Sequence, residues 1–352
     1  MTTAKPIIFD GHNDVLSKIF SEGGLARAAS FLEGREGAID LKKAEVGGFG
    51  GGFFAVYVPS KFDLEFSYQE MEKASYSLPL PEPIEWSEAV AVVASQVTIL
   101  RELERLGCIT ICHSVSDIRS AFENEKIAAI FHIEGAEAID PDLYMLEVLH
   151  SAGLRSIGPV WSRPTIFGEG VPFSFPSSPN IGSGLTELGI ALVKRCNELN
   201  IMIDLSHLNE AGFWDVARHS NAPLVATHSN AHSITQHSRN LTDKQLRAIA
   251  DSDGMVGLNF ATAFLREDGK MLADVSLSQM LKHLDYLLEI LGEDRVGLGS
   301  DYDGAVMPEK LTDLSGLPNL RRAMKQHGYD EKIIKKICHE NWLRVLQKTW
   351  GC

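Results

Sequence analysis

Long apolar runs, paired cysteines and positive charge are all scarce in this sequence. No apolar run approaches the ~20 residues that a membrane-spanning helix needs. Only Ile7–Phe9 precede Asp10 as an apolar stretch, which is too short for the core of a signal peptide. The five cysteines are odd in number and scattered, a distribution typical of a reducing compartment. We therefore expect a cytoplasmic protein without a membrane segment.

The balance of charge excludes another class of partner. Lysine and arginine number 33 against 47 aspartates and glutamates, which gives a formal net charge of −14. A surface this acidic repels phosphate backbones, so we expect no binding to nucleic acid. Hydrophobic residues make up 44% of the chain and charged residues 23%, as in ordinary globular proteins, which excludes a disordered chain. No linker rich in proline, glycine or serine divides residues 1–352, so we expect a single domain.

Short apolar runs alternate with longer amphipathic segments along nearly the whole chain. Runs rich in valine and isoleucine that are too short for helices are typical of buried parallel strands. Eight such strands alternating with helices predict a (β/α)8 barrel. The expected strands are Pro6–Phe9, Phe53–Val58, Ile127–Ile133, Leu154–Val160, Ile201–Leu205, Leu224–Thr227, Met255–Phe260 and Val296–Gly299. The expected helices are Ser87–Leu106, Glu187–Leu199, Asn209–His219, Thr242–Ala250 and Ser276–Leu291, with a capping box at Thr242 and Gln245.

Four segments fall outside this alternation. Ile109–Cys112 forms a ninth run, which we interpret as a small strand or hairpin outside the barrel. Residues 61–85 and 162–182 are long insertions of the kind that follow barrel strands and cover the site. The stretch from Leu317 to Trp350 is expected to form helices that close the fold.

Histidines and carboxylates recur where the expected strands end. Side chains two apart on a strand point the same way, so His12 and Asp14 can face one point. The carboxyl ends of all barrel strands meet at one mouth. Four other strands end near that mouth in the same residue types, at Glu134, His207, His228 and Asp301.

This pattern favours a metal centre. One histidine at a strand end is more often a hydrogen-bonded polar residue than a ligand, but five strands that all deliver such residues are harder to explain in that way. Imidazole and carboxylate donors suit zinc. Three histidines, one aspartate and one glutamate exceed the three protein ligands of a usual catalytic zinc, whereas two metals that share a carboxylate would use them all. His132, two residues before Glu134, is expected to lie deeper in the barrel, outside the ligand set.

Several motifs together give the chain a specific resemblance over nearly its whole length. The chain resembles the membrane dipeptidase (renal dipeptidase) family, a branch of the amidohydrolase-type metallohydrolases. The resemblance rests on Asp10-Gly11-His12-Asn13-Asp14, Gly47–Phe54, Ile133-Glu134-Gly135, Ile203-Asp204-Leu205-Ser206-His207, Thr227-His228-Ser229-Asn230-Ala231, Ser238-Arg239-Asn240 and Gly299-Ser300-Asp301-Tyr302-Asp303-Gly304.

The resemblance implies a zinc-dependent dipeptidase with two Zn²⁺ ions per chain. By that resemblance His12 and Asp14 bind one metal, His207 and His228 bind the other, and Glu134 bridges them. Asp301 is the implied acid–base residue, beside a hydroxide held between the metals. Arg239 is the implied partner of the free carboxylate of a dipeptide, in which L-L and L-D pairs are both expected. A homodimer is left open as the assembly.

Trp161 marks a departure from the family, whose mammalian members have a substrate-binding histidine at this place. An indole N–H donates one hydrogen bond but cannot accept one or carry charge. We expect Trp161 to form an aromatic wall of the substrate pocket instead, and Arg163 to bring a positive charge to the edge of that pocket.

Two other functions stay open at this point. A related metallohydrolase would act on an N-acyl amino acid, a cyclic amide or a lactone. A barrel that only binds a ligand is the second alternative, and the intact Asp301 beside five intact ligand residues argues against it.

Overall fold

A barrel of parallel strands forms the centre of the molecule. The computed structural model describes residues 7–60 and 64–351. Neighbouring strands follow the order β8-β6-β5-β2-β1-β11-β10-β9, and the bridge between Asp204 and Val225 joins the two ends of that path. The (β/α)8 architecture is therefore confirmed. The barrel strands are β1 (Ile8–Asn13), β2 (Phe49–Tyr57), β5 (Ile127–Glu134), β6 (Leu154–Gly158), β8 (Met202–Ile203), β9 (Val225–Ala226), β10 (Met255–Asn259) and β11 (Val296–Gly299).

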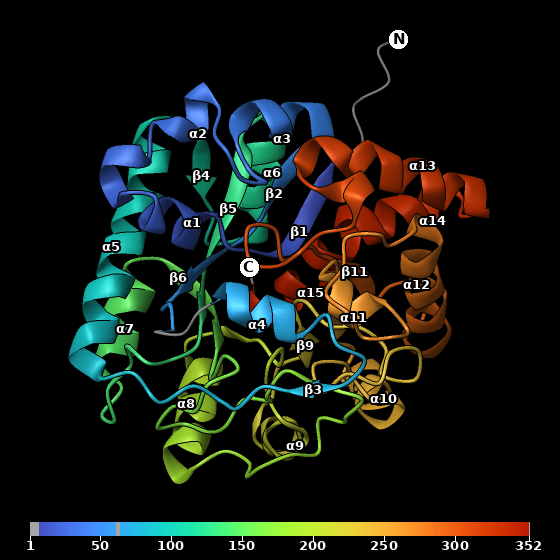
Figure 1. Cartoon of the computed structure of the whole chain (residues 1–352). Coiled ribbons are helices and arrows are strands. Elements are labelled where there is room, and N and C mark those ends of the chain that lie inside the picture. Colours follow the sequence, from blue (N-terminus) through green and yellow to red (C-terminus); the bar gives the residue numbers. More distant parts are fainter. Residues whose placement is uncertain (1–6, 61–63, 352) are drawn as a thin grey trace.

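Helices surround this barrel on the outside (Figure 1). The five expected helices are present with ends that differ by one residue at most from the prediction, as α5 (Trp86–Arg105), α8 (Glu187–Glu198), α9 (Glu210–His219), α10 (Asp243–Asp251) and α12 (Leu277–Leu291). The capping box at Thr242 and Gln245 is formed. Further helices before the C-terminal segment are α1 (Val15–Ser21), α2 (Ser30–Glu33), α3 (Leu41–Gly47), α4 (Leu64–Glu70), α6 (Val115–Glu123), α7 (Tyr144–Ser151) and α11 (Thr262–Leu265), with 3-10 turns at Gly24–Arg27, Glu309–Leu311 and Leu314–Gly316.

The expected first strand lies too early in the chain. β1 begins at Ile8 and continues to Asn13, so His12 lies within the strand instead of after it. Pro6 lies outside the described residues. The register of β1 on β2 shifts between Asp10 and Asn13, and this irregular end of the strand carries the ligand motif.

The ninth apolar run is a strand beside the barrel. β4 (Ile109–Ile111) pairs in parallel with the first half of β5, and β6 pairs with the second half. It is therefore a single small strand and no hairpin. Both β4 and β6 pair with β5, and all eight residues of β5 are buried.

The C-terminal segment closes the amino end of the barrel, as expected. It forms α13 (Leu317–His327), α14 (Glu331–Lys335), a π-helical turn at Lys336–Glu340 and α15 (Asn341–Trp350). Trp342 of α15 is fully buried and packs in one cluster with Phe9, Phe53 and Met202. Its indole N–H donates to the Leu298 carbonyl at 3.0 Å. A Cβ at Gly11 would overlap this indole, so glycine is required there.

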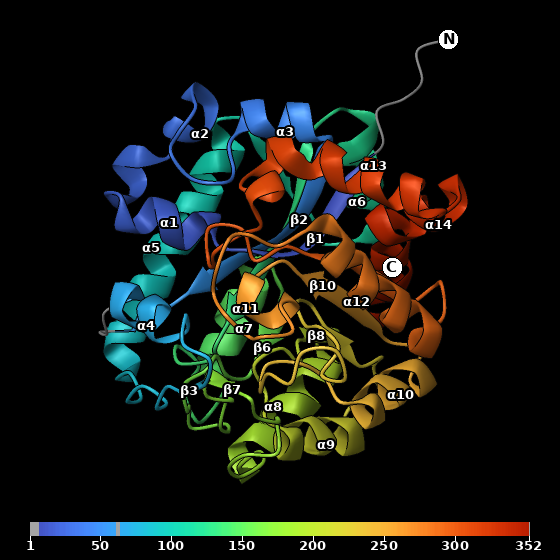
Figure 2. The ribbon, with the colours of Figure 1, turned by 45° about the vertical axis from the view of Figure 1, so that its right-hand side comes forward.

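The two insertions meet over the opposite end. β3 (Tyr76–Ser77) comes from the first insertion and β7 (Ser174–Phe175) from the second, and they pair as a small antiparallel sheet. Figure 2 shows β3 and β7 side by side at the lower left of the molecule. Residues 61–63 of the first insertion lie outside the described part. Of the described helices, none combines the length and apolar character that a bilayer crossing requires.

Candidate metal centre

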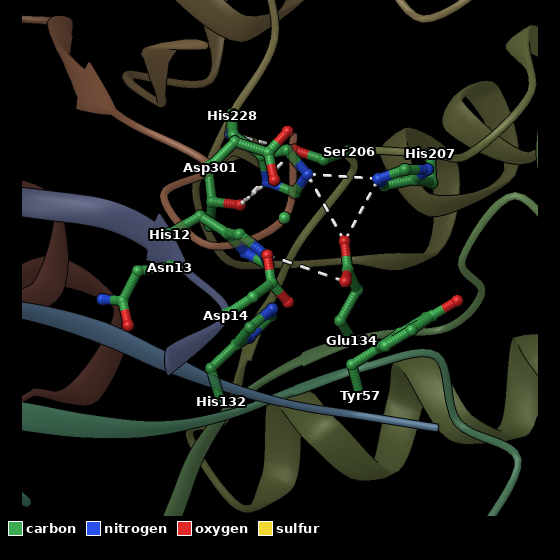
Figure 3. A network of polar contacts seen from close by, with 12 residues as sticks. His12, Asn13, Asp14, Tyr57, His132, Glu134, Ser206, His207, His228 and Asp301 are labelled. Atoms are coloured by element: carbon green, nitrogen blue, oxygen red, sulfur yellow. Dashed lines mark hydrogen bonds and ion pairs between the residues drawn. The ribbon is translucent and has the colours of Figure 1, made fainter. Parts of the chain in front are cut away.

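The predicted ligand residues converge at the carboxyl end of the barrel (Figure 3). His12 lies in β1, and Glu134 is the last residue of β5. Asp14 precedes the first turn of α1. His207, His228 and Asp301 follow β8, β9 and β11. Strands far apart in the sequence thus bring all six side chains to one mouth, as the sequence predicts.

Glu134 occupies the centre of this group. Its Oε1 atom lies 3.1 Å from Nε2 of His207 and 3.4 Å from Nε2 of His228. Its Oε2 atom lies 3.7 Å from Nε2 of His12, which is 3.5 Å from Oδ2 of Asp14. The two carboxylate oxygens therefore face two different sets of donors, an arrangement suited to a carboxylate shared by two cations.

Unpaired nitrogens indicate that a cation fits here. His12 is fully buried, and neither of its ring nitrogens has a hydrogen-bond partner among the described residues. Buried polar groups without a partner are rare and costly. The ligand atoms of Glu134, His207 and His228 lie within 4.8 Å of one another, as do those of His12, Asp14 and Asp301. Imidazole and carboxylate donors in two such groups fit two divalent metals of the zinc type.

The electrostatics of the group also favour bound positive charge. Burial lowers the pKa values of His207 and His228 well below the usual value, so both rings are neutral and offer a lone pair. Burial alone would lower the pKa of His12 too, but the charges of Glu134 and Asp14 raise it to about 10. The carboxylates that would hold a proton on His12 would equally attract a metal cation.

Hydrogen bonds orient the two neutral imidazoles. The Thr227 hydroxyl donates to Oδ2 of Asp204 at 2.5 Å, so it accepts from Nδ1 of His228, at 2.8 Å. Ser162 Oγ lies 2.8 Å from Nδ1 of His207. With Nδ1 engaged in each ring, the Nε2 atoms face Glu134. Histidine ligands of metals are usually fixed in this way by a partner on the other nitrogen.

His132 lies beneath the group, as expected from its position in the strand. Its Nδ1 atom is 2.9 Å from Ser156 Oγ, and its Nε2 atom is 3.7 Å from Asp204. It belongs to none of the ligand triplets found among the described residues.

Asp301 lies at the edge of the group with its carboxylate anchored on one side. Asn259, the last residue of β10, donates from Nδ2 to Asp301 Oδ2 at 2.9 Å. The backbone N–H of Asp301 donates to the His12 carbonyl at 3.0 Å. Burial and the nearby Asp14 raise the pKa of Asp301.

Arg239 is a buried cation close to the same carboxylates. Its guanidinium donates to the His228 carbonyl at 3.0 Å and lies 5.4 Å from the centre of the Phe264 ring. Its Nε atom has no hydrogen-bond partner, and no ion pair to Arg239 is found within residues 7–60 and 64–351. Burial lowers its pKa to about 10, which leaves it charged at neutral pH.

A cavity of about 350 Å³ opens onto the ligand group. Asp14, Glu134, His207 and Asp301 contribute to its floor, and its walls are mainly apolar. The wall residues include Tyr57, Tyr68, Met71, Leu78, Trp161, Phe173, Phe264 and Met271.

Trp161 is part of this wall, as predicted. Its ring centroid lies 5.1 Å from that of Tyr57 and 5.7 Å from that of His207. The expectation for Arg163 is wrong. Arg163 is fully buried and donates to Glu137 at 2.6 Å, so its charge is neutralised away from the cavity.

Sequence reasoning missed the residues that support the ligands. Asp204 was seen only as part of a motif, although a carboxylate just before His207 is itself a signal. Its Oδ1 atom accepts from the backbone N–H groups of Ser206 and Thr227. Asn259 ends an apolar strand without being a metal-ligand type, so only the structure shows its contact with Asp301.

Comparisons with known proteins identify the family to which the chain is similar. The family model described as "Membrane dipeptidase (Peptidase family M19)" matches residues 2–350. A solved metallopeptidase of Rhodobacter sphaeroides, liganded with a phosphinate mimic of the dipeptide L-Ala-D-Ala, is 51% identical with a TM-score of 0.96. That match covers 98% of this chain and 100% of the other.

Two further relatives extend the comparison. An uncharacterized protein from the region 5′ of pqqA in Klebsiella pneumoniae is 47% identical over 265 residues, which cover 75% of this chain and 98% of the relative. The probable dipeptidase PvdM of Pseudomonas aeruginosa is 22% identical with a TM-score of 0.83, and the match covers 99% of this chain and 96% of that one. At that identity the likeness shows a shared fold.

Proposed function

Because the chain belongs to the membrane dipeptidase family, we propose that it hydrolyses the peptide bond of dipeptides at a centre of two zinc ions. The observation that carries the proposal is the position of Glu134, whose two oxygens face two separate groups of donors beneath a small cavity.

Five side chains are proposed to hold the two ions. His12 and Asp14 would bind one, His207 and His228 the other, and Glu134 both. The unpaired nitrogens of His12 and the fixed Nδ1 atoms of His207 and His228 support this assignment. When bound, zinc polarises a carbonyl group and lowers the pKa of water toward neutrality.

Asp301 is proposed to move the proton. The reaction removes a proton from the attacking water and delivers one to the leaving nitrogen, so one group that takes and then returns the proton suffices. Asp301 lies at the cavity floor beside Asp14, with its backbone held by His12.

Arg239 is proposed to bind the free carboxylate of the substrate. A planar guanidinium matches a carboxylate with two parallel hydrogen bonds. A buried cation without a counter-ion is costly, and a substrate carboxylate would supply one. In the structure Arg239 lies behind Phe264 and does not reach the cavity wall, so we expect the Phe264 ring to shift when substrate binds.

The size and character of the cavity define the substrate class. A volume of about 350 Å³ suits a dipeptide and excludes a folded protein. The aromatic and thioether wall favours apolar side chains, in which Trp161 would take part. The relative that was solved with a mimic of L-Ala-D-Ala supports the inclusion of L-D dipeptides beside L-L dipeptides.

The test is a panel of L-L and L-D dipeptides assayed with zinc-loaded protein whose metal content has been measured. We expect hydrolysis with about two zinc ions per chain. If every dipeptide fails while N-acyl amino acids, cyclic amides or lactones react, the proposal is wrong. If nothing reacts and ligands only bind, the protein is a binding barrel.

We also propose a single domain, a cytoplasmic location and a homodimer. One domain is supported by a barrel that runs from β1 to β11 with its amino end closed by α15. A cytoplasmic location is supported by the four described cysteines, which are buried and unpaired. A homodimer is testable by light scattering of the purified protein.

A further inference from the structure

Asn259 connects the residues proposed to act at the two ends of the substrate. It is fully buried at the end of β10. Its Nδ2 group donates to Asp301 Oδ2 at 2.9 Å and approaches the His228 carbonyl at 3.4 Å. The same carbonyl accepts from the guanidinium of Arg239 at 3.0 Å. Asp301 and Arg239 are thus joined through one amide and one shared carbonyl oxygen.

The orientation of this amide is fixed by its surroundings. Asn259 Oδ1 accepts from the Ala261 backbone N–H at 2.6 Å. Turning the amide over would place Oδ1 against the Asp301 carboxylate and Nδ2 against an N–H group, and both contacts would be repulsive. Asn259 therefore offers Asp301 a donor and nothing else.

A second asparagine holds the backbone of the first. Asn230 accepts from the Asn259 N–H at 2.9 Å and donates to the Asn259 carbonyl at 3.0 Å. Asn230 is also fully buried. This two-point contact fixes the end of β10, so the amide cannot follow Asp301 if the carboxylate moves.

The contact makes the two oxygens of Asp301 unequal. Oδ2 accepts the amide N–H, whereas no hydrogen bond to Oδ1 is found in the described part of the chain. Space beside Oδ1 is kept open by Gly304, where a Cβ would lie 2.7 Å from Oδ1 and would overlap Asp14. The contact with Asn259 therefore fixes which way the carboxylate of Asp301 is turned.

We propose that Asn259 is a positioning residue that holds Oδ2 of Asp301 and so fixes the orientation of this carboxylate for its proposed reaction. The inference rests on the proposed role of Asp301 in dipeptide hydrolysis. It predicts that Asn259 acts on turnover through Asp301 and does not act on metal binding.

The experiment is a double-mutant cycle in the zinc-loaded protein, with Asn259→Ala, Asp301→Asn and the double variant. Loss of one hydrogen bond to a charged group should lower kcat by ~10–100-fold, with KM and zinc content little changed. In the Asp301→Asn background the same change should lower kcat by less than about threefold, because the two residues act as a unit. Asn259→Asp keeps the shape of the side chain and the hydrogen bond from the Ala261 N–H, but it removes the N–H group that donates to Asp301. This variant takes the place of Asn259→Ala in the experiment if the alanine variant does not fold.

Asn341→Ala is the matched control. Asn341 is a buried asparagine that donates to the Glu293 and Val296 carbonyls, both at 2.8 Å, at the closed end of the barrel. Its replacement should lower thermal stability and leave kcat unchanged.

The outcomes separate the inference from the function it rests on. If Asp301→Asn keeps nearly full turnover, the proposed role of Asp301 is wrong. If Asp301→Asn is impaired but both Asn259 variants turn over normally, only the positioning role is wrong. Additive losses in the double variant, or loss of zinc from the Asn259 variants, would also overturn it, because either result indicates a general structural role.

Discussion

At the scale of single residues, the two oxygens of Glu134 carry the proposed binuclear arrangement. Oε1 faces His207 and His228, and Oε2 faces His12. Loss of the Glu134 side chain should therefore weaken binding at both proposed metal positions.

The first prediction concerns Glu134→Gln. An amide keeps the shape but removes the negative charge and one acceptor, so both metals should bind more weakly. Metal analysis after gel filtration should show less than one zinc ion per chain. Glu210→Gln, on the outer helix α9, is the control and should keep the full content. Loss of only one ion from Glu134→Gln would remove Glu134 from the bridge.

The second prediction concerns Asp301→Asn, which should keep both metals and lower kcat by ~10²–10⁴-fold. The asparagine retains the bulk of the side chain but cannot take up the proton. Steady-state kinetics beside metal analysis measure both effects. Turnover within a few-fold of the unaltered protein would assign the proton to another group. Asp303 is a poor substitute, because its carboxylate already accepts from Arg35 and from the Ala38 backbone N–H.

The third prediction concerns Trp161, which lines the cavity beside His207. Trp161→Ala and Trp161→His should change the order of preference within a dipeptide panel, since both remove apolar wall from one side of the substrate. The measurement is kcat/KM for each dipeptide. A uniform change across the panel would place Trp161 outside substrate contact.

The convergence of the candidate residues is predictable from the sequence where the residue itself is of a ligand type. His12, Asp14, Glu134, His207, His228 and Asp301 lie together at the carboxyl end of the barrel, although His12 lies within β1 instead of after it. Arg163 was misjudged because its partner Glu137 is distant from it in sequence and invisible in local spacing. The role of Asn259 is not visible in the sequence for the same reason, since it depends on a contact with Asp301 at the end of the neighbouring strand β11.

At the scale of elements, apolar runs predicted the strands better than their ends. β11 has the predicted bounds, whereas β8 and β9 retain only two residues each. Beyond those residues the chain leaves the ladder to place His207 and His228. The pairing of β4 with β5 is not predictable from the sequence either, because a short apolar run does not indicate which strand it pairs with.

The fourth prediction concerns α15, which closes the barrel with Trp342. Trp342→Ala would leave a cavity among the side chains at the amino end of the barrel and would remove the hydrogen bond to the Leu298 carbonyl. The free energy of unfolding should therefore fall by about 3–5 kcal/mol. Denaturant titration measures the loss. KM for the best dipeptide should stay unchanged, because the indole lies at the opposite end from the substrate cavity. A selective rise in KM would contradict that separation.

At the scale of the whole molecule, bound metal and folding should be coupled. The proposed ligand residues come from β1, the end of β5 and the loops after β1, β8 and β9, so ions held among them would link segments distant in sequence. A ligand that binds only the folded chain stabilises it by mass action, by about 2.7 kcal/mol at one hundred times the dissociation constant.

The fifth prediction is that a chelator lowers Tm by several degrees and that added zinc restores it. Differential scanning calorimetry with and without EDTA is the measurement. The Glu134→Gln variant is the control, and its Tm should respond much less. An unaltered Tm after verified metal removal would show that the centre contributes little to folding.

The buried Trp342 also determines which end of the barrel is open to substrate and products. With the amino end filled by side chains, the cavity communicates with solvent at the carboxyl end alone within the described structure. A dipeptide enters by that mouth, and both amino acids must leave by it. We therefore expect each product amino acid to compete with the next dipeptide for that mouth, so that free amino acids inhibit the reaction.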